Sequence, residues 1–119
     1  MAEVWRETFK IVGTNTAQLN AGSVLVIEDR ENAEKHGNLP HNAFVIANQD
    51  VTSTLYIFLD DFSDQDKPDY ILFPSQQITV GIEDGVHFTT LWIKNTHATN
   101  NISANSIKYR ISTIKKVNI

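Results

Sequence analysis

Hydrophobic and polar residues alternate with a period of two in several segments of the chain, which is the pattern expected of β-strands with one buried face. The clearest example is segment 107–113, where apolar and polar residues take turns (Ile107, Tyr109 and Ile111 against Lys108, Arg110 and Ser112). Segment 4–12 alternates as well and places its large apolar side chains on one face (Trp5, Phe9 and Ile11). Segment 54–59 is apolar on both faces, and the other candidate strands are 23–28, 43–48, 70–73, 76–82 and 88–94.

Short polar breaks separate these segments. Residues 48–50 and 83–85 each lie between two apolar runs at the length of a hairpin loop, so both predict β-hairpins. Prolines flank segment 70–73 and predict an edge strand or a loop anchor, because proline cannot donate to a sheet. The best helical candidate, 29–36, is polar all round and predicts at most two surface turns.

Seven or eight short strands without intervening helices predict an all-β fold. The expected architecture is an antiparallel β-sandwich of the jelly-roll or immunoglobulin-like kind. A length of 119 residues, with no repeat or linker, predicts that 1–119 form a single domain.

Composition and charge exclude several classes of function. The chain has no cysteine, so it has no disulfide, no thiolate metal ligand and no thiol nucleophile. Ten Lys and Arg against fourteen Asp and Glu give a net charge of −4, which argues against nucleic acid as the main partner. No apolar run approaches the roughly 18 residues of a membrane span, and the first residues lack the shape of a signal peptide. We therefore expect no nucleic-acid partner, no membrane partner and no Sec export.

The acidic connection 60–69 is the main candidate for metal binding, among long connections that also include 29–42 and 95–105. Its aspartates could supply oxygen ligands to calcium (Asp60, Asp61, Asp64 and Asp66). The loop lacks the glycine and the closing glutamate of an EF-hand, so a solvated acidic loop is the alternative. Apart from calcium, we expect no cofactor.

No motif for catalysis is present. The four histidines (His36, His41, His87 and His97) form no metal-ligand pair and are expected at the surface. No Gly-x-Ser-x-Gly elbow, phosphate loop or dinucleotide fingerprint occurs. We therefore predict that the protein is not an enzyme.

The aromatic residues allow two interpretations. Five of them could form a platform for a sugar (Trp5, Trp92, Tyr56, Tyr70 and Tyr109), or they could fill the core or an interface. Alternation breaks where aromatics cluster after position 57, which suggests an apolar contact between protomers (Phe58, Phe62, Tyr70 and Phe73). The same side chains could instead fill a core beneath the acidic loop.

Residues 43–111 resemble the small β-sandwich proteins of tailed-phage virions, including capsid decoration proteins and head-fibre or tail-associated modules. The resemblance rests on the order of short motifs: Phe44–Asn48, Ser53–Asp60, Ile71–Thr79, Leu91–Lys94 and Ile107–Ile111. Pro74-Ser75 stands where those proteins commonly have Pro-Gly. The resemblance implies a non-enzymatic component located in the virion, present in many copies and often trimeric, with capsid or other virion proteins as partners.

These observations lead to one functional hypothesis and one alternative. We expect a structural protein of a virus particle, a capsid decoration or fibre/tail-associated protein that acts by binding and assembly. Residues 1–12, which carry Trp5 and Phe9, are a possible exchange or docking strand, so their removal should abolish assembly and leave the rest folded. The alternative is a small carbohydrate-binding module.

Overall fold

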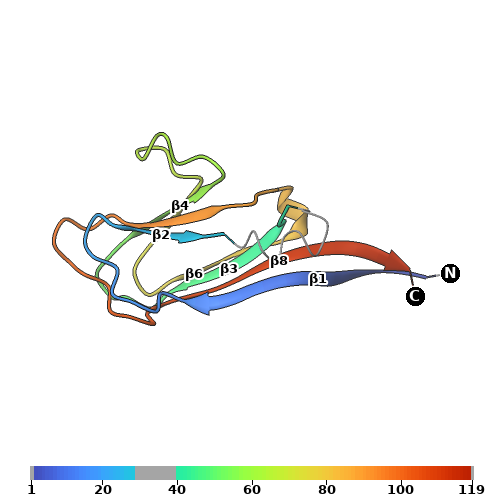
Figure 1. Cartoon of the computed structure of the whole chain (residues 1–119), viewed down its shortest axis with the longest axis horizontal. Helices are drawn as coiled ribbons and strands as arrows, with labels where there is room; N and C mark the ends of the chain where they lie inside the picture. The colour runs from blue at the N-terminus through green and yellow to red at the C-terminus, as the bar shows by residue number, and fades with distance from the viewer. Residues whose placement is uncertain (1, 29–39, 119) are drawn as a thin grey trace.

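The computed structural model describes residues 2–28 and 40–118, which form a sandwich of two four-stranded antiparallel sheets (Figure 1). The strands are β1 (Glu3–Thr14), β2 (Val24–Ile27), β3 (Ala43–Asn48), β4 (Leu55–Leu59), β5 (Tyr70–Leu72), β6 (Gln77–Val80), β7 (Leu91–Asn95) and β8 (Ile107–Asn118), with a short 3₁₀ turn, η1 (Ile82–Asp84). One sheet has the order β1-β8-β3-β6 and the other the order β2-β7-β4-β5. The prediction of an antiparallel β-sandwich is confirmed. The predicted helical turns at 29–36 lie outside the described residues.

The core lies between the sheets and is built from the inward-facing positions of the alternating strands. Six aliphatic side chains from both sheets have no exposed surface at all (Ile46, Leu55, Ile57, Leu91, Ile93 and Ile107). Because β-branched and leucine side chains fill a pleated inner face well, this layer accounts for the period-two pattern of the sequence.

The strand pairing is nested. β1 pairs with β8, β2 with β7, β3 with β6 and β4 with β5, while β3–β8 and β4–β7 contacts complete the two sheets. The predicted hairpins at 48–50 and 83–85 are therefore wrong, since β3 and β4, like β6 and β7, belong to different sheets. A short polar break looks the same in sequence whether the chain returns in its own sheet or crosses to the other one. The edge position predicted for segment 70–73 is confirmed for β5.

A β-bulge in β1 changes which residues share a face. Glu7 lies opposite Ile114 and Phe9 lies opposite Thr113, so Thr8 is an extra residue in the strand. Trp5 therefore faces the outer side of the sheet and Phe9 the inner side, whereas simple alternation placed them together.

The turn at Pro74-Ser75 keeps a backbone conformation that suits glycine. Ser75 has a φ of 60°, in the left-handed region. Its N–H donates to the carbonyl of Asp50 at 3.0 Å. The serine thus occupies the strained position that a Pro-Gly sequence would occupy without strain.

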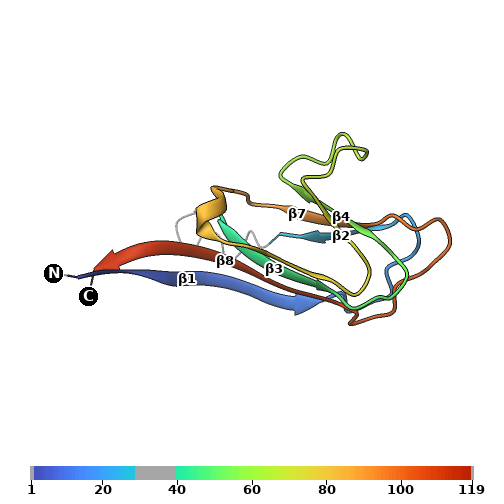
Figure 2. The same ribbon diagram turned by 180° about the vertical axis from the view of Figure 1, so that it is seen from behind.

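β1 and β8 extend beyond the rest of their sheet as a two-stranded ribbon (Figures 1 and 2). β3 pairs with β8 only from Ile107 to Ser112, whereas β1 pairs with it as far as Asn118. The Asn42 amide adds one further rung, since it donates to the carbonyl of Ile114 at 2.7 Å and accepts its N–H at 2.8 Å. The ribbon contributes to an elongated shape of 55 × 26 × 24 Å.

Candidate functional site

The predicted docking strand is an integral part of the sheet. β1 pairs with β8 of its own chain from Glu3 to Thr14, and Ile11 packs against the core. Within the described part of the chain, β1 has a strand on one side only, so its other edge carries unpaired backbone groups. A docking role for this segment would have to use that edge or the outer face rather than a detached strand.

Trp5 lies on the outer face of the ribbon and is 56% exposed. The Nζ atom of Lys116 lies 5.5 Å from the centre of its ring, a cation–π contact, and 3.5 Å from a carboxylate oxygen of Glu3. Tryptophan is enriched in protein interfaces, so its exposure here marks a candidate contact.

Positive charge is concentrated in β1 and β8. These two strands hold six of the ten Lys and Arg residues of the chain and only two of the fourteen Asp and Glu residues. They carry a formal charge of +4, although the whole chain carries −4. The net charge of the whole chain therefore conceals a local excess of cations on these two strands.

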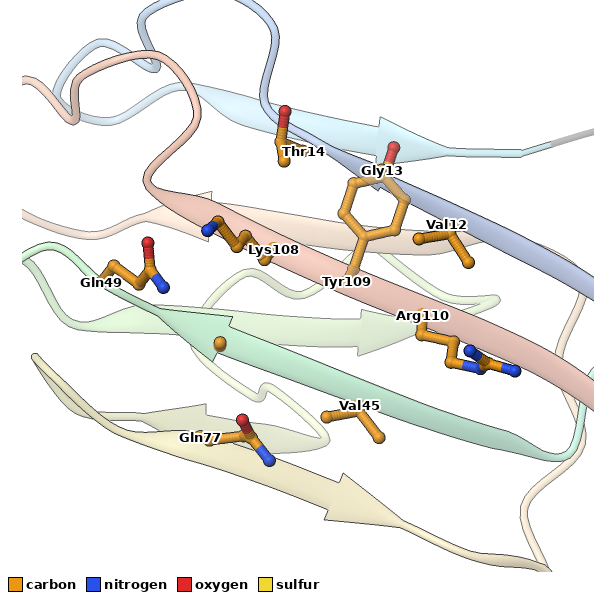
Figure 3. A pocket seen from close by; sticks show the side chains of 10 residues that line it. Val12, Gly13, Thr14, Val45, Gln49, Gln77, Lys108, Tyr109 and Arg110 are labelled. Atoms are coloured by element: carbon orange, nitrogen blue, oxygen red, sulfur yellow. The ribbon is translucent and has the colours of Figure 1, made fainter.

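The outer face of sheet β1-β8-β3-β6 contains a hollow of about 480 Å³ (Figure 3). Its apolar side chains come from β1 and β3 (Val12, Val45 and Ala47), and Lys108, Arg110, Gln49 and Gln77 surround them. Val12 is 62% exposed. We call this hollow, together with Lys10 on the same face, the basic face. The strand register places Lys10, Val12, Lys108 and Arg110 on one face. Val12 and Val45 both lie opposite Arg110, and Lys108 lies opposite Ala47. Lys10 is two positions before Val12 and therefore points to the same side.

Tyr109 and Gly13 meet at the margin of this hollow. A Cβ atom at position 13 would lie only 2.6 Å from the Tyr109 hydroxyl oxygen and 2.9 Å from the ring. Glycine therefore allows the close approach of the aromatic ring. Burial raises the pKa of the Tyr109 hydroxyl.

A carboxylate neutralises one cation of the basic face. Glu7 accepts hydrogen bonds from Arg110, at 2.5 Å and 3.2 Å, and from the Ser112 hydroxyl. The hydrogen bond from Arg110 lowers the pKa of Glu7, with partial opposition from burial. The Lys108 side chain is exposed and makes no hydrogen bond or ion pair with the described residues, so its ammonium group is available to a partner.

The aromatic residues around the acidic loop fill a second, smaller core. Phe58 has no exposed surface and meets Phe62 edge to face at 4.8 Å between ring centres. Phe62 in turn stacks on Trp92 at 5.7 Å. Loop 60–69 thereby folds over the outer face of sheet β2-β7-β4-β5, which explains why segment 54–59 is apolar on both faces.

The proposed apolar contact surface is consequently divided. Phe58 is buried, and Tyr70 turns inward to meet Phe44 edge to face at 5.6 Å, so neither forms a surface patch. Burial, with Asp84 and Asp69 adding to it, raises the pKa of Tyr70. Of the six residues predicted for an interface, only Trp5 and Phe73 (55% exposed) are largely accessible. The five-residue sugar platform is divided too, because Tyr109 packs against the core and Trp92 is covered on one side by Phe62.

The aspartates proposed as calcium ligands engage different partners, inside and outside the loop. Asp60 Oδ1 accepts the N–H groups of Thr89 and Thr90 at 2.8 and 2.9 Å. Asp61 accepts from Ser63, which lowers its pKa, and Asp64 accepts the N–H of Asp66 at 3.2 Å. Among the residues placed in the structure, no three His, Asp or Glu side chains gather as a metal site would require.

Sequence reasoning missed a set of buried asparagines at the end of the sandwich away from the ribbon. Asn15, Asn48 and Asn95 are at most 2% exposed. Asn95, for example, donates to the carbonyls of Leu19 and Asn100 at 3.1 and 2.8 Å and accepts the N–H of His97 at 3.2 Å. The high asparagine content of the sequence was the one sign of these residues. It indicated turns, but it did not indicate that asparagine side chains hold neighbouring loops together.

The surface position predicted for the histidines is wrong for His41. It is 4% exposed, stacks on Phe9 at 5.7 Å, and its Nδ1 lies 3.0 Å from the Thr113 hydroxyl. His97 is partly buried and its Nδ1 accepts two loop N–H groups, His87 is exposed, and His36 lies outside the described residues. Because His41 is packed between strands, we assign it a role in the stability of the fold.

Comparison of the chain with models of protein families, with curated proteins and with solved structures finds no significant match. No helix in segments 2–28 and 40–118 is long and apolar enough to cross a membrane. The features of the molecule that bear on its function are therefore the sandwich architecture and two charged surfaces, the basic face and the acidic loop.

Proposed function

We propose that the protein is a non-enzymatic structural component of a virus particle, a capsid decoration or fibre/tail-associated protein that acts by binding and assembly. The observation that carries the proposal is the nested strand pairing, first with last and inward to β4 with β5. This strand order favours the jelly-roll form of the sandwich, an architecture used in viral capsid and lectin domains. An immunoglobulin-like order would instead place strands A, B, E and D in one sheet.

The ribbon and the basic face support a role in binding rather than catalysis. Trp5 and Val12 are exposed on one face of the two strands that hold six of the ten Lys and Arg residues of the chain. Exposed tryptophan is typical of interfaces, and concentrated charge steers the approach of a partner of opposite charge.

The direct test is mass spectrometry of density-gradient-purified particles of the virus whose genome encodes the chain. We expect peptides of this protein to band with the particles at a constant ratio to the major capsid protein. Presence of the protein in infected cells but not in purified particles would overturn the proposal.

The carbohydrate-binding alternative has its own readout. A glycan screen followed by tryptophan fluorescence would detect a sugar close to Trp5 or Trp92. A saturable fluorescence change with one glycan, combined with absence from particles, would replace the virion role by a lectin-like one.

A further inference from the structure

We infer that the basic face is a docking surface for a second copy of this chain and that it receives the acidic loop, residues 60–69, of that copy. The inference deepens the proposed function, on which it rests for its biological setting, by stating how neighbouring copies would meet. Its physical basis is the match between two surfaces of opposite charge on one molecule.

The first surface combines a concave apolar floor with free positive charge. Val12, Val45 and Ala47 provide the apolar lining of the 480 Å³ hollow. Lys108 lines the same hollow and has no partner among the described residues, and Lys10 lies on the same face of the sheet. A side chain that enters the hollow would therefore find apolar contact and a cation together (Figure 3).

The second surface is the acidic loop. It carries five aspartates and one lysine, and Asp61, Asp64 and Asp66 are exposed. Stacking of Phe62 on Trp92 and the acceptance of the Leu59 N–H by Asp69 at 2.7 Å hold the loop in a defined shape. A preorganised loop loses little conformational entropy on binding. Exposed apolar side chains adjoin it at β5 and just after it, Ile71 (48% exposed) and Phe73.

The two surfaces cannot meet within one molecule. The loop projects from the outer side of sheet β2-β7-β4-β5, whereas the basic face is the outer side of the opposite sheet (Figures 1 and 2). Contact between them is therefore intermolecular and joins the front of one copy to the back of the next. Such a heterologous contact gives a closed ring when its rotation closes and an open chain when it does not.

A second copy fits the basic face better than nucleic acid does. Glu7 and Glu3 lie among the cations and already pair with Arg110 and Lys116. Those carboxylates would repel phosphates, and the apolar lining of the hollow has no group that could bind a phosphate. The acidic loop, in contrast, brings isolated carboxylates that can each meet one free lysine.

The test is a charge-exchange cycle on the full chain, read by sedimentation velocity over a range of protein concentrations at low and at physiological salt. We expect the wild type to self-associate with a salt-sensitive affinity. Asp66→Lys and Lys108→Glu should each weaken association about three- to tenfold, and the double variant should regain most of the loss. The Asp66 and Lys108 side chains are exposed and make no hydrogen bond or ion pair with other described residues, so neither change should disturb the fold.

Two control variants match the changes in charge. Glu83→Lys, in η1, changes the net charge as Asp66→Lys does, and Lys115→Glu, on the other face of the ribbon, matches Lys108→Glu. Both should associate like the wild type. A single species near three times the 13.4 kDa mass, or a mass that grows with concentration, supports a ring or an open chain.

Three results would overturn the inference. They are a wild type that stays monomeric at all concentrations, association that both single variants leave unchanged, and association that the control variants weaken as much. Binding of a single-stranded oligonucleotide at physiological salt by a monomeric wild type would assign the face to nucleic acid instead. This test uses the purified chain alone, so a negative result would overturn the self-contact without bearing on the virion role. Absence of the protein from purified particles would overturn the virion role without bearing on a self-contact measured in solution.

Discussion

At the scale of single residues, polar side chains that the sequence shows as ordinary surface residues hold this fold together. Asn15, Asn48 and Asn95 are buried, and each is satisfied by backbone groups of neighbouring loops. Burial of an amide is costly unless it is hydrogen-bonded, so these residues fix the loops as much as the apolar core fixes the sheets. One sequence offers no pattern that separates such an asparagine from one in a solvated turn.

The buried amide of Asn95 should make a measurable contribution to stability. Asn95→Ala removes its hydrogen bonds and leaves the carbonyls of Leu19 and Asn100 without this donor. We expect the free energy of unfolding in urea to fall by about 1–3 kcal/mol. Asn118→Ala, at the exposed end of β8, is the matched control and should change it by less than about 0.5 kcal/mol. Equal effects of the two substitutions would contradict the assignment.

Glu7 should make the fold sensitive to acid. Its pKa in the folded protein is lower than the ordinary value of 4.5, so the unfolded chain binds the proton more readily. The stabilisation is therefore complete above about pH 4.5 and is lost as the pH falls through the lowered pKa. Glu7→Gln should show a shallower loss of melting temperature between neutral pH and pH 3 than the wild type. Arg110→Gln should have the same effect, and an unchanged slope in both variants would count against the ion pair.

At the scale of elements, the sequence predicted the strands but not their partners. Alternation marked strands such as β1 and β8, whereas a run that is apolar on both faces marked β4. This hydrophobic pattern located all eight strands, and its largest error is the end of β8, which lies five residues beyond the predicted one. It failed at the bulge, where Thr8 reverses the order of faces, and at the two predicted hairpins, which cross between sheets. Pairing depends on contacts between distant segments, and a local pattern contains no information about them.

The pairing of β1 reverses the expected result of removing it. Loss of residues 1–12 would expose one side of β8 and remove the contacts of Phe9 and Ile11, so we expect the cooperative thermal transition to disappear. Loss of residues 1–6 removes only the ribbon tip beyond β3 and should leave the transition in place. Circular dichroism during heating distinguishes the two truncations. A folded 1–12 deletion would restore the hypothesis of a detachable docking strand.

At the scale of the whole molecule, the charge is divided between two regions. The strands β1 and β8 carry +4, although the chain as a whole carries −4. The net charge of the sequence gives no sign of this division, because composition averages over regions that the fold separates. The candidate interface could be predicted only in part from the sequence, because it is formed by segments that the fold brings together. Trp5 was identified, whereas Val12, Lys108 and Arg110 became neighbours of Val45 only through the strand order.

This division predicts unusual behaviour on ion-exchange resins. At pH 7 and low ionic strength, we expect the protein to bind a cation exchanger despite its negative net charge, because the basic strands present their charges together. Lys115→Glu with Lys116→Glu should abolish retention, whereas Lys67→Glu with Lys94→Glu makes the same change in net charge elsewhere and should leave most of it. A wild type that flows through the column would show that the surrounding acidic groups outweigh the ribbon.

The nested pairing also has a consequence for the order in which the protein forms. Thr8 and Thr113 are hydrogen-bonded although 105 positions separate them, so β1 leaves the ribosome long before β8 exists to pair with it. During synthesis the Trp5–Ile11 segment is an unpaired strand with exposed aromatic side chains, the kind of segment that pairs with other chains. Among the described strands, β4 and β5 are the only paired ones that follow each other directly in the chain, so they alone can pair early. We therefore expect rapid, concentrated expression to favour exchange of β1 between nascent chains, and slow expression at low temperature to favour the closed monomer.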